Sequence, residues 1–329
     1  MNRRKFIKAS AGAALSPGVF AGCRSAVPPA REPTPVILAT DIGDDIDDTW
    51  ALGFLLKSPE LKLELVATEF GKAHYRAKLL AKFLERTGHA TVPIAVGPDA
   101  EPRGEGALAE WVKNYDLRSY PGRVHADGVA AIIEVIMGSS QPVSLICIGP
   151  MPNVAAALER EPRIAQRARF VGMDGSVRLG YGGSKTPDAE WNVKANPTAA
   201  KKVLAANWDI TITPLDTCGL VTLDGARYQR MLQARDPVPA TIVENYRLWS
   251  KAGQKEAEAE LHSSTLFDTV AVYLAFDQQF CKMEQLGIRV TDEGLTVIDA
   301  QAKPMNVATA WKDLEGFRDL LVNRLCGPG

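Results

Sequence analysis

The 329-residue chain has few of the residues that mark several common protein classes. Its five cysteines are widely spaced and form no CxxC pair, so neither a disulfide-rich scaffold nor a cysteine zinc site is indicated. A formal net charge of -1 argues against a broad cationic face for nucleic acid. No apolar run reaches the roughly 20 residues that a membrane-spanning helix needs.

The N-terminus differs from the rest of the chain. A twin arginine at positions 3 and 4 precedes an apolar stretch, Ala9 to Gly22, that ends at Cys23. This pattern is typical of a twin-arginine (Tat) export signal, and its end resembles the lipobox of bacterial lipoproteins. The alternative, an amphipathic first helix, would be interrupted by a proline. We therefore expect residues 1–23 to be a signal, residues 24–34 a flexible tether, and the protein to be a periplasmic lipoprotein anchored to the membrane only through Cys23.

The remaining residues, 35–329, are expected to form a single catalytic domain. A content of 46% hydrophobic and 23% charged residues is typical of a soluble globular protein. Short apolar runs alternate with helical patterns, which predicts an α/β fold with an open, mainly parallel twisted sheet flanked by helices. Strands are expected at 36–39, 63–68, 92–96, 143–148, 170–173 and 209–213, with a late hairpin at 288–298. Helices are expected at 49–56, 77–86, 128–137, after residue 152, at 239–250 and at 269–276. Ligands of such sheets bind at the carboxyl ends of the strands.

An acidic segment follows the first expected strand. Residues 39 to 48 read ATDIGDDIDD, so five carboxylates crowd one strand-to-helix loop. Like charges this close raise one another's pKa unless a cation compensates them, and a helix N-terminus carries too little positive charge for five. Oxygen ligands select calcium or magnesium, and calcium tolerates irregular coordination better. The segment therefore predicts a calcium (Ca2+) site. The alternative is a solvated turn in which Asp47 or Asp48 caps the following helix.

This loop resembles the DxDPGxDDxxAL signature of the inosine-uridine-type nucleoside hydrolase family. Four further segments are similar to elements of that family, and the likeness extends over the chain from residue 35 onward. They are Ile148 to Asn153 (IGPMPN, against GPLTN), Ala189 to Asn192 (AEWN, against AEFN), Leu215 to Thr217 (LDT, against LDVT) and Phe267 to Ala271 (FDTVA, against HDPxA). The resemblance implies a Rossmann-like core and hydrolysis of the N-glycosidic bond of ribonucleosides to ribose and free base.

The resemblance also implies roles for individual residues. Calcium would be held by Asp41, Asp48, the backbone carbonyl of Ile148 and Asp268. Ribose hydroxyls would be bound by Asp47, Glu190, Asn192 and the backbone near Met173. Asp41 would also take a proton from the calcium-bound water. Family members are often dimers or tetramers, so a homo-oligomer is implied as well.

The residues themselves favour the same chemistry. Cleavage of an N-glycosidic bond passes through a positively charged sugar, which needs nearby negative charge, an activated water and groups that hold the hydroxyls. In an extended segment Glu190 and Asn192 would point to the same side and could hold one sugar. For Asp268 the alternative is an ordinary helix N-cap.

Departures from the family pattern leave several roles open. The chain has three residues rather than one between Gly43 and the aspartate pair, so Asp44 and Asp45 are candidate replacement ligands. Lys72 either pairs with this loop or is solvated. Tyr246 and Trp249 either line the leaving-group pocket or pack in the core.

The leaving-group acid is the clearest departure. Phe267 stands where several members carry the histidine assigned to protonating the base. Of the four histidines, His262 lies close to Asp268 in sequence and is the candidate catalytic acid, with His74 as a second candidate. The alternative for His262 is an exposed position at the end of a charged helix, residues 255–260.

The leading hypothesis is therefore a calcium-dependent N-glycosidase that acts on a small-molecule nucleoside outside the cytoplasm. One alternative keeps the fold and the metal but cleaves another pentoside. The other is a calcium-stabilised sugar- or nucleoside-binding lipoprotein without turnover.

Overall fold

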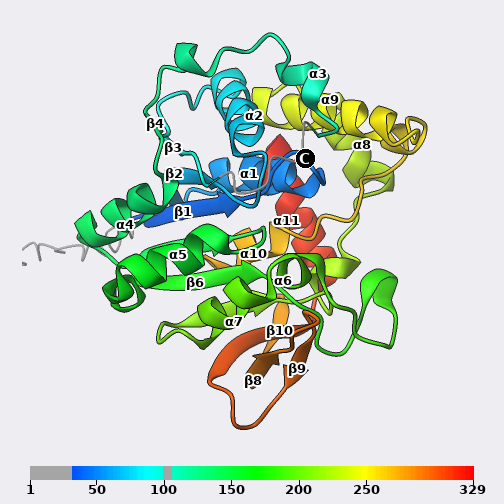
Figure 1. Cartoon of the computed structure of the whole chain (residues 1–329). Helices are drawn as coiled ribbons and strands as arrows, with labels where there is room; N and C mark the ends of the chain where they lie inside the picture. The colour runs from blue at the N-terminus through cyan, green and yellow to red at the C-terminus, as the bar shows by residue number, and fades with distance from the viewer. Residues whose placement is uncertain (1–31, 99–105) are drawn as a thin grey trace, which may run out of the picture. The chain divides into compact units, whose positions relative to one another are not determined.

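A computed structural model describes residues 32–98 and 106–329 (Figure 1). The predicted signal, Cys23 and most of the predicted tether lie outside the described residues. Residues Pro33–Gly329 form one compact unit. Among the helices of the described ranges, none combines the length and the apolar character needed to cross a membrane.

The strands of the described residues form a ten-stranded sheet in the order β4-β3-β2-β1-β5-β6-β7-β10-β8-β9. Their bounds are β1 Thr34–Thr40, β2 Leu61–Thr68, β3 Ile94–Ala95, β4 Val124–His125, β5 Val143–Cys147, β6 Ala168–Met173, β7 Ile210–Thr213, β8 Cys281–Val290, β9 Thr296–Ile298 and β10 Pro304–Trp311. Neighbours from β4 to β10 pair in parallel, whereas β8 pairs antiparallel with β10 and with β9. The predicted mainly parallel α/β sheet and its late hairpin are confirmed.

Helices cover both faces of this sheet (Figure 1). The α-helices are α1 Asp47–Leu56, α2 Ala73–Arg86, α3 Ala109–Val112, α4 Gly128–Gly138, α5 Pro152–Arg160, α6 Trp191–Ala195, α7 Pro197–Ala205, α8 Gly225–Gln233, α9 Pro237–Ala252, α10 Thr269–Leu274 and α11 Leu314–Cys326. Because side chains alternate along a strand, Val36 and Leu38 of β1 join the core with α1, α2 and α8 to α11, whereas Ile37 and Ala39 join the core with α4, α5 and α7.

The strand order reverses beside β1. The chain passes from β1 to β2 on one side, and β5 pairs with the other side of β1. Loops that leave the carboxyl ends of β1 and β5 therefore diverge toward opposite faces of the sheet, which opens a crevice between them. The acidic loop follows β1, so the fold places it at this crevice.

Several local predictions were wrong in their bounds. Glu190 and Asn192 do not lie in an extended segment, because Glu190 is the N-cap of α6 and Asn192 is inside that helix. The charged helix expected at 255–260 is reduced to one 3-10 turn, Glu258–Glu260. The strand expected at 92–96 shrinks to β3, since Pro93 has no N–H to donate. Helix α9 begins earlier than expected because the Asp236 side chain accepts from the Val238 N–H at 2.9 Å.

Candidate active site

A pocket opens at the crevice between β1 and β5. Its lining residues come from the β1–α1 loop, from the ends of β5 and β6, and from the segments before α6 and α10. They are Asp41, Asp44, Asp45, Asp47, Asp48, Ile148, Met173, Tyr181, Glu190, Trp191, Asn192, Phe267 and Asp268. The structure thus brings together every predicted site residue except His262.

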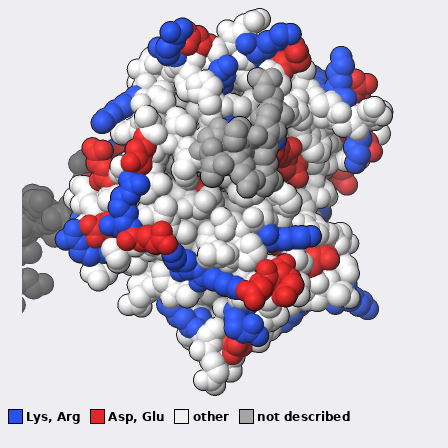
Figure 2. Space-filling view, in the orientation of Figure 1, with Lys and Arg blue, Asp and Glu red and all other residues white. Residues whose placement is uncertain are grey.

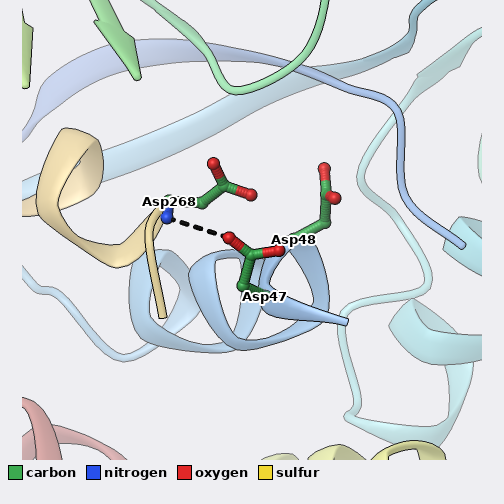
Figure 3. Close-up of side chains that lie close together, drawn as sticks. All are labelled: Asp47, Asp48 and Asp268. Carbon is green, nitrogen blue, oxygen red and sulfur yellow. Dashed lines mark hydrogen bonds between the residues drawn. The ribbon is translucent and has the colours of Figure 1, made fainter. Parts of the chain in front are cut away.

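Three carboxylates form the tightest group in this pocket. Asp47 and Asp48 begin α1, and Asp268 directly precedes α10; one carboxylate oxygen of each lies within 4.8 Å of the others (Figure 3). The Asp47 Oδ2 atom accepts the backbone N–H of Asp268 at 3.2 Å. None of the three makes a side-chain cap bond, because the N-cap of α1 is Ile46 and that of α10 makes no such bond. The helix-cap alternative therefore does not account for them.

Burial strongly disfavours the charged forms of these groups. Asp47, Asp48 and Asp268 are at most 4% exposed. Loss of water raises the pKa of each carboxyl well above its ordinary value, and repulsion from neighbouring carboxylates adds to the rise. The Thr40 hydroxyl donates to Asp48 and partly offsets this rise. Such a cluster could bind a metal ion, whose charge would compensate the carboxylates.

Asp41 lies beside this cluster, at the end of β1. Burial raises its pKa to about 6, and the Arg76 guanidinium opposes the rise. Glycine at position 149 allows the close approach of β5, because an added Cβ there would lie 2.7 Å from the Asp41 Oδ1 atom. Asp41 lines the same pocket but lies outside the three-carboxylate group. Its predicted roles as ligand and base stay predictions.

Arg76, which the sequence did not reveal, holds the acidic loop in place. It is 1% exposed and extends from α2 toward the loop. Its Nη1 donates to the carbonyl oxygens of Asp41 and of Ile42, the latter at 2.9 Å, and its Nε donates to that of Gly71 at 3.0 Å. Its Nη2 donates to Asp44 Oδ2 at 2.8 Å and to the Phe70 carbonyl at 3.0 Å. One side chain therefore joins the loops that follow β1 and β2.

Asp44 and Asp45, the additional acidic residues after Gly43, differ in their surroundings. Asp44 forms ion pairs with Arg76 and with Lys72, whose Nζ lies 2.6 Å from Asp44 Oδ1. These two cations hold the Asp44 pKa below its ordinary value despite partial burial. Lys72 therefore pairs with the acidic loop. Asp45 is exposed at the rim of the pocket, where it accepts only the N–H of Ile46, at 2.7 Å, among the hydrogen bonds of the described residues.

Glu190 and Asn192 face the same pocket despite their unexpected helical position. The Glu190 carboxylate accepts the backbone N–H groups of Gly175, Asn192 and Val193 at 2.8, 2.7 and 3.3 Å. Burial raises its pKa to about 7, and these three donors oppose the rise. The Asn192 side-chain amide donates to the Met173 carbonyl at 2.9 Å. Both polar groups are thus fixed before any ligand arrives.

Two further lining residues, Tyr181 and Trp191, were missed. Trp191 lies between the predicted residues Glu190 and Asn192, and this position in the sequence was its only sign of a place in the site. Tyr181 lies in a glycine-rich turn, Tyr181–Gly183, that has no periodic pattern. The Tyr181 ring lies 6.1 Å from the Phe267 ring, and the Trp191 ring lies 6.3 Å from the Phe70 ring, measured between ring centroids.

The candidate acid His262 is not brought to the pocket. Its side chain is exposed, and its Nδ1 lies 2.8 Å from the Ser263 carbonyl oxygen. The segment before it is a turn rather than a helix, so the chain follows a different path from the one expected. His74 lines a separate hollow with Lys78 and Arg118. No histidine lies among the described residues that line the acidic pocket.

Tyr246 and Trp249 pack rather than line the site. Tyr246 is 2% exposed, and its ring stacks on that of Trp249 with centroids 6.1 Å apart. The Trp249 Nε1 donates to the Asp44 carbonyl oxygen at 2.9 Å, which supports the acidic loop from outside the pocket. The packing alternative is therefore confirmed.

The four described cysteines are free thiols. Cys147 is fully buried, and burial raises its pKa well above the ordinary value, as expected for an unreactive core residue.

On the face drawn in Figure 2, lysine and arginine side chains are interspersed with aspartate and glutamate.

The fold and the pocket define an α/β protein whose sheet carries, at its switch point, a carboxylate-rich site that could hold a metal ion. The sequence profile described as "inosine-uridine preferring nucleoside hydrolase" matches residues 36–319. The chain belongs to this family and is an enzyme that acts on N-glycosyl compounds.

Similar proteins agree with this assignment. The chain is 27% identical over 310 residues to the pyrimidine-specific ribonucleoside hydrolase RihA of Enterobacter sp. (strain 638), covering 88% of this chain and 97% of that one. It is 28% identical over 299 residues to the non-specific ribonucleoside hydrolase RihC of Klebsiella pneumoniae (strain 342), covering 86% and 95%. A purine-preferring ribonucleoside hydrolase from Gardnerella vaginalis shares the fold, with a TM-score of 0.73, 22% identity and coverage of 89% and 98%.

Proposed function

We propose that the chain hydrolyses the N-glycosidic bond of ribonucleosides to ribose and free base, with calcium as its cofactor. One observation carries the proposal: the three-carboxylate group and the side chains expected to hold ribose line a single pocket at the carboxyl ends of parallel strands. The two curated relatives named above, which the chain matches over almost their whole length, are ribonucleoside hydrolases. The partner is therefore a small-molecule nucleoside.

The donor set fits calcium. Asp48 and Asp268 offer buried carboxylate oxygens, and Asp41 and Ile148 line the same space. The described lining residues include no imidazole or thiolate, the donors that zinc and copper favour. We propose Asp41, Asp48, the Ile148 carbonyl and Asp268 as the ligands. When bound, calcium would compensate the carboxylates and make a neighbouring water more acidic.

The protein's own side chains then divide the remaining chemistry. Asp47, Glu190 and Asn192 bind the ribose hydroxyls and fix the ring. As the C–N bond breaks, positive charge develops on the sugar, and the buried carboxylates beside it stabilise that charge. Asp41 accepts the proton of the attacking water, for which a pKa of about 6 suits a base that works near neutral pH.

Product analysis tests this function. Purified protein with 1 mM calcium is incubated with uridine, cytidine, inosine and adenosine, and free base and ribose are separated by liquid chromatography. We expect release of free base that chelation abolishes and that Asp41→Asn lowers by about a hundredfold or more. Asp224→Asn is the matched control, because Asp224 is exposed and lies outside the pocket.

The alternatives give different results in the same assay. If another pentoside is cleaved while every ribonucleoside stays intact, the protein would be a pentoside hydrolase with the same fold and metal but a different substrate. Tight nucleoside binding in a calorimeter without any product would indicate a binding lipoprotein. Either result would overturn the proposed ribonucleoside hydrolysis.

We also propose that the protein is exported and lipid-anchored, on the strength of the twin arginine and Cys23. A chain expressed with its native N-terminus should fractionate with membranes, and Cys23→Ala should release it into the periplasm. Retention of the native chain in the cytoplasm would contradict the proposal. A homo-oligomer is proposed on family grounds alone, and a monomer mass in light scattering would contradict it.

A further inference from the structure

Aromatic rings surround the outer part of the pocket, and core packing does not account for two of them. Trp191 and Tyr181 are 48% and 43% exposed, whereas Glu190 and Asn192, the expected ribose ligands, are 2% and 5% exposed. Phe267 completes the group, with its ring at 82° to that of Tyr181. Exposed flat rings beyond a ribose site offer a stacking surface for the leaving base.

Acidic side chains predominate among the described residues that line the same pocket. Seven of its lining residues are carboxylates. Among the described residues, Lys72 and Arg76 form ion pairs with Asp44 and with none of the other six. Asp45 differs from the five buried carboxyls because it is exposed at the rim, and within residues 32–98 and 106–329 no lysine, arginine or histidine pairs with it.

The described residues at the outer part of the pocket offer a poor proton donor to a leaving base, since Glu190, with a pKa of about 7, is buried at the expected ribose end. The base of a neutral nucleoside departs slowly unless it is protonated as the C–N bond breaks. No histidine, lysine or cysteine is present among the described lining residues. The Tyr181 hydroxyl accepts the backbone N–H of Trp191 at 3.0 Å, and partial burial raises the pKa of this hydroxyl, so it is a weak acid. An aglycone that is already cationic at its glycosidic nitrogen needs no proton.

We propose that the preferred substrates are ribosides with a cationic aglycone, such as pyridinium ribosides, an inference that rests on the proposed N-ribohydrolase function. The C–N bond breaks with its electron pair moving to the nitrogen, and the aglycone leaves as a neutral pyridine. Water forms the new C–O bond and gives up one proton, so each turnover releases one proton. The exposed Asp45 at the rim attracts the cation, and Trp191 and Tyr181 bind it through their ring faces.

A pair of inhibitors isolates the effect of charge. N1-methylnicotinamide, a cation, and nicotinamide, its neutral counterpart, are tested as competitive inhibitors of riboside hydrolysis in the presence of calcium. We expect the cation to bind at least about fivefold more tightly at 20 mM salt, and this preference to shrink at 300 mM salt because ions screen the rim charge. Equal inhibition constants at both salt concentrations would overturn the proposal.

Turnover provides a second readout. Nicotinamide riboside should have a kcat/KM at least about tenfold above those of uridine and inosine, with one proton per turnover detected by an indicator dye. Asp45→Asn should lower kcat/KM about three- to tenfold more for nicotinamide riboside than for uridine. Asp224→Asn should leave the ratio of the two substrates unchanged.

The two proposals fail separately. If uridine or inosine is hydrolysed as efficiently as nicotinamide riboside and the inhibitors bind alike, ribonucleoside hydrolysis stands and the cationic preference is wrong. If no riboside is cleaved by protein that is folded by circular dichroism and binds calcium, the proposed function fails, and the inference fails with it.

Discussion

Removal of the proposed calcium ion should destabilise the protein more as the pH rises. Without a bound metal ion, burial raises the pKa of Glu190 from 4.5 to about 7 and that of Asp41 from 3.8 to about 6. Between about pH 4 and 7, the folded state therefore keeps protons that the unfolded state has lost. The free energy of unfolding of the metal-free protein consequently falls as the pH rises, by about 3 kcal/mol for each group.

Calcium should reverse this dependence because it binds the ionised carboxylates and displaces their protons. With 1 mM calcium and a Kd of about 10 µM, the stabilisation would be about 2.7 kcal/mol. For a chain of this size that corresponds to a Tm increase of about 5 °C. At pH 5 the buried carboxyls hold their protons, so calcium should raise the free energy of unfolding by less than about 1 kcal/mol.

Thermal unfolding by circular dichroism at pH 5 to 8, with chelator or with 1 mM calcium, measures both effects. Asp48→Asn is the diagnostic variant. Because it lacks this buried carboxylate, its metal-free form should have a higher Tm than the metal-free wild type at pH 8. It should also lose most of the Tm increase that calcium gives to the wild type. Asp224→Asn should follow the wild type. Two results would refute the reasoning. One is a Tm of the metal-free protein that rises from pH 5 to pH 8, and the other is an equal Tm increase on adding calcium at the two pH values.

Three further substitutions probe single contacts. Arg76→Met leaves the carbonyls of the acidic loop without their donor and should cost about 3–5 kcal/mol in urea unfolding, whereas a cost below about 1 kcal/mol would contradict the contacts described. Thr40→Val removes the donor to Asp48 and should weaken calcium binding about tenfold in calorimetry; unchanged affinity would show that this bond does not orient the carboxylate. Trp191→Ala should change the unfolding free energy by less than about 0.5 kcal/mol because the ring is 48% exposed, yet raise KM several-fold; an unchanged KM would place the leaving group elsewhere.

The sheet and the position of the site could be predicted from sequence for physical reasons. Buried parallel strands read as short apolar runs, and the segment Val36 to Ala39 gave such a signal directly before the acidic loop. In a parallel sheet the carboxyl ends of neighbouring strands meet at one edge. Residues 41, 148 and 173 follow or end β1, β5 and β6, so their convergence follows from topology alone.

The contacts that depend on loop paths could not be predicted. His262 is only six residues from Asp268, yet a turn rather than a helix precedes it and the side chain is exposed outside the pocket. Arg76 lies in an amphipathic helix, where a buried arginine has no periodic signature. Gly43, at φ 105°, allows the loop to turn in a way that residues with a side chain rarely adopt.

The structure explains how one short loop can carry five carboxylates. Asp41, Asp47 and Asp48 are buried in the pocket, where a divalent ion or retained protons would compensate them. Asp44 turns toward α2 and is balanced by Lys72 and Arg76, and the same guanidinium binds the backbone of the loop. The longer spacing after Gly43 therefore adds ion pairs of Asp44 that fix the loop, and it leaves Asp45 exposed at the rim, where no cationic side chain of the described residues pairs with it.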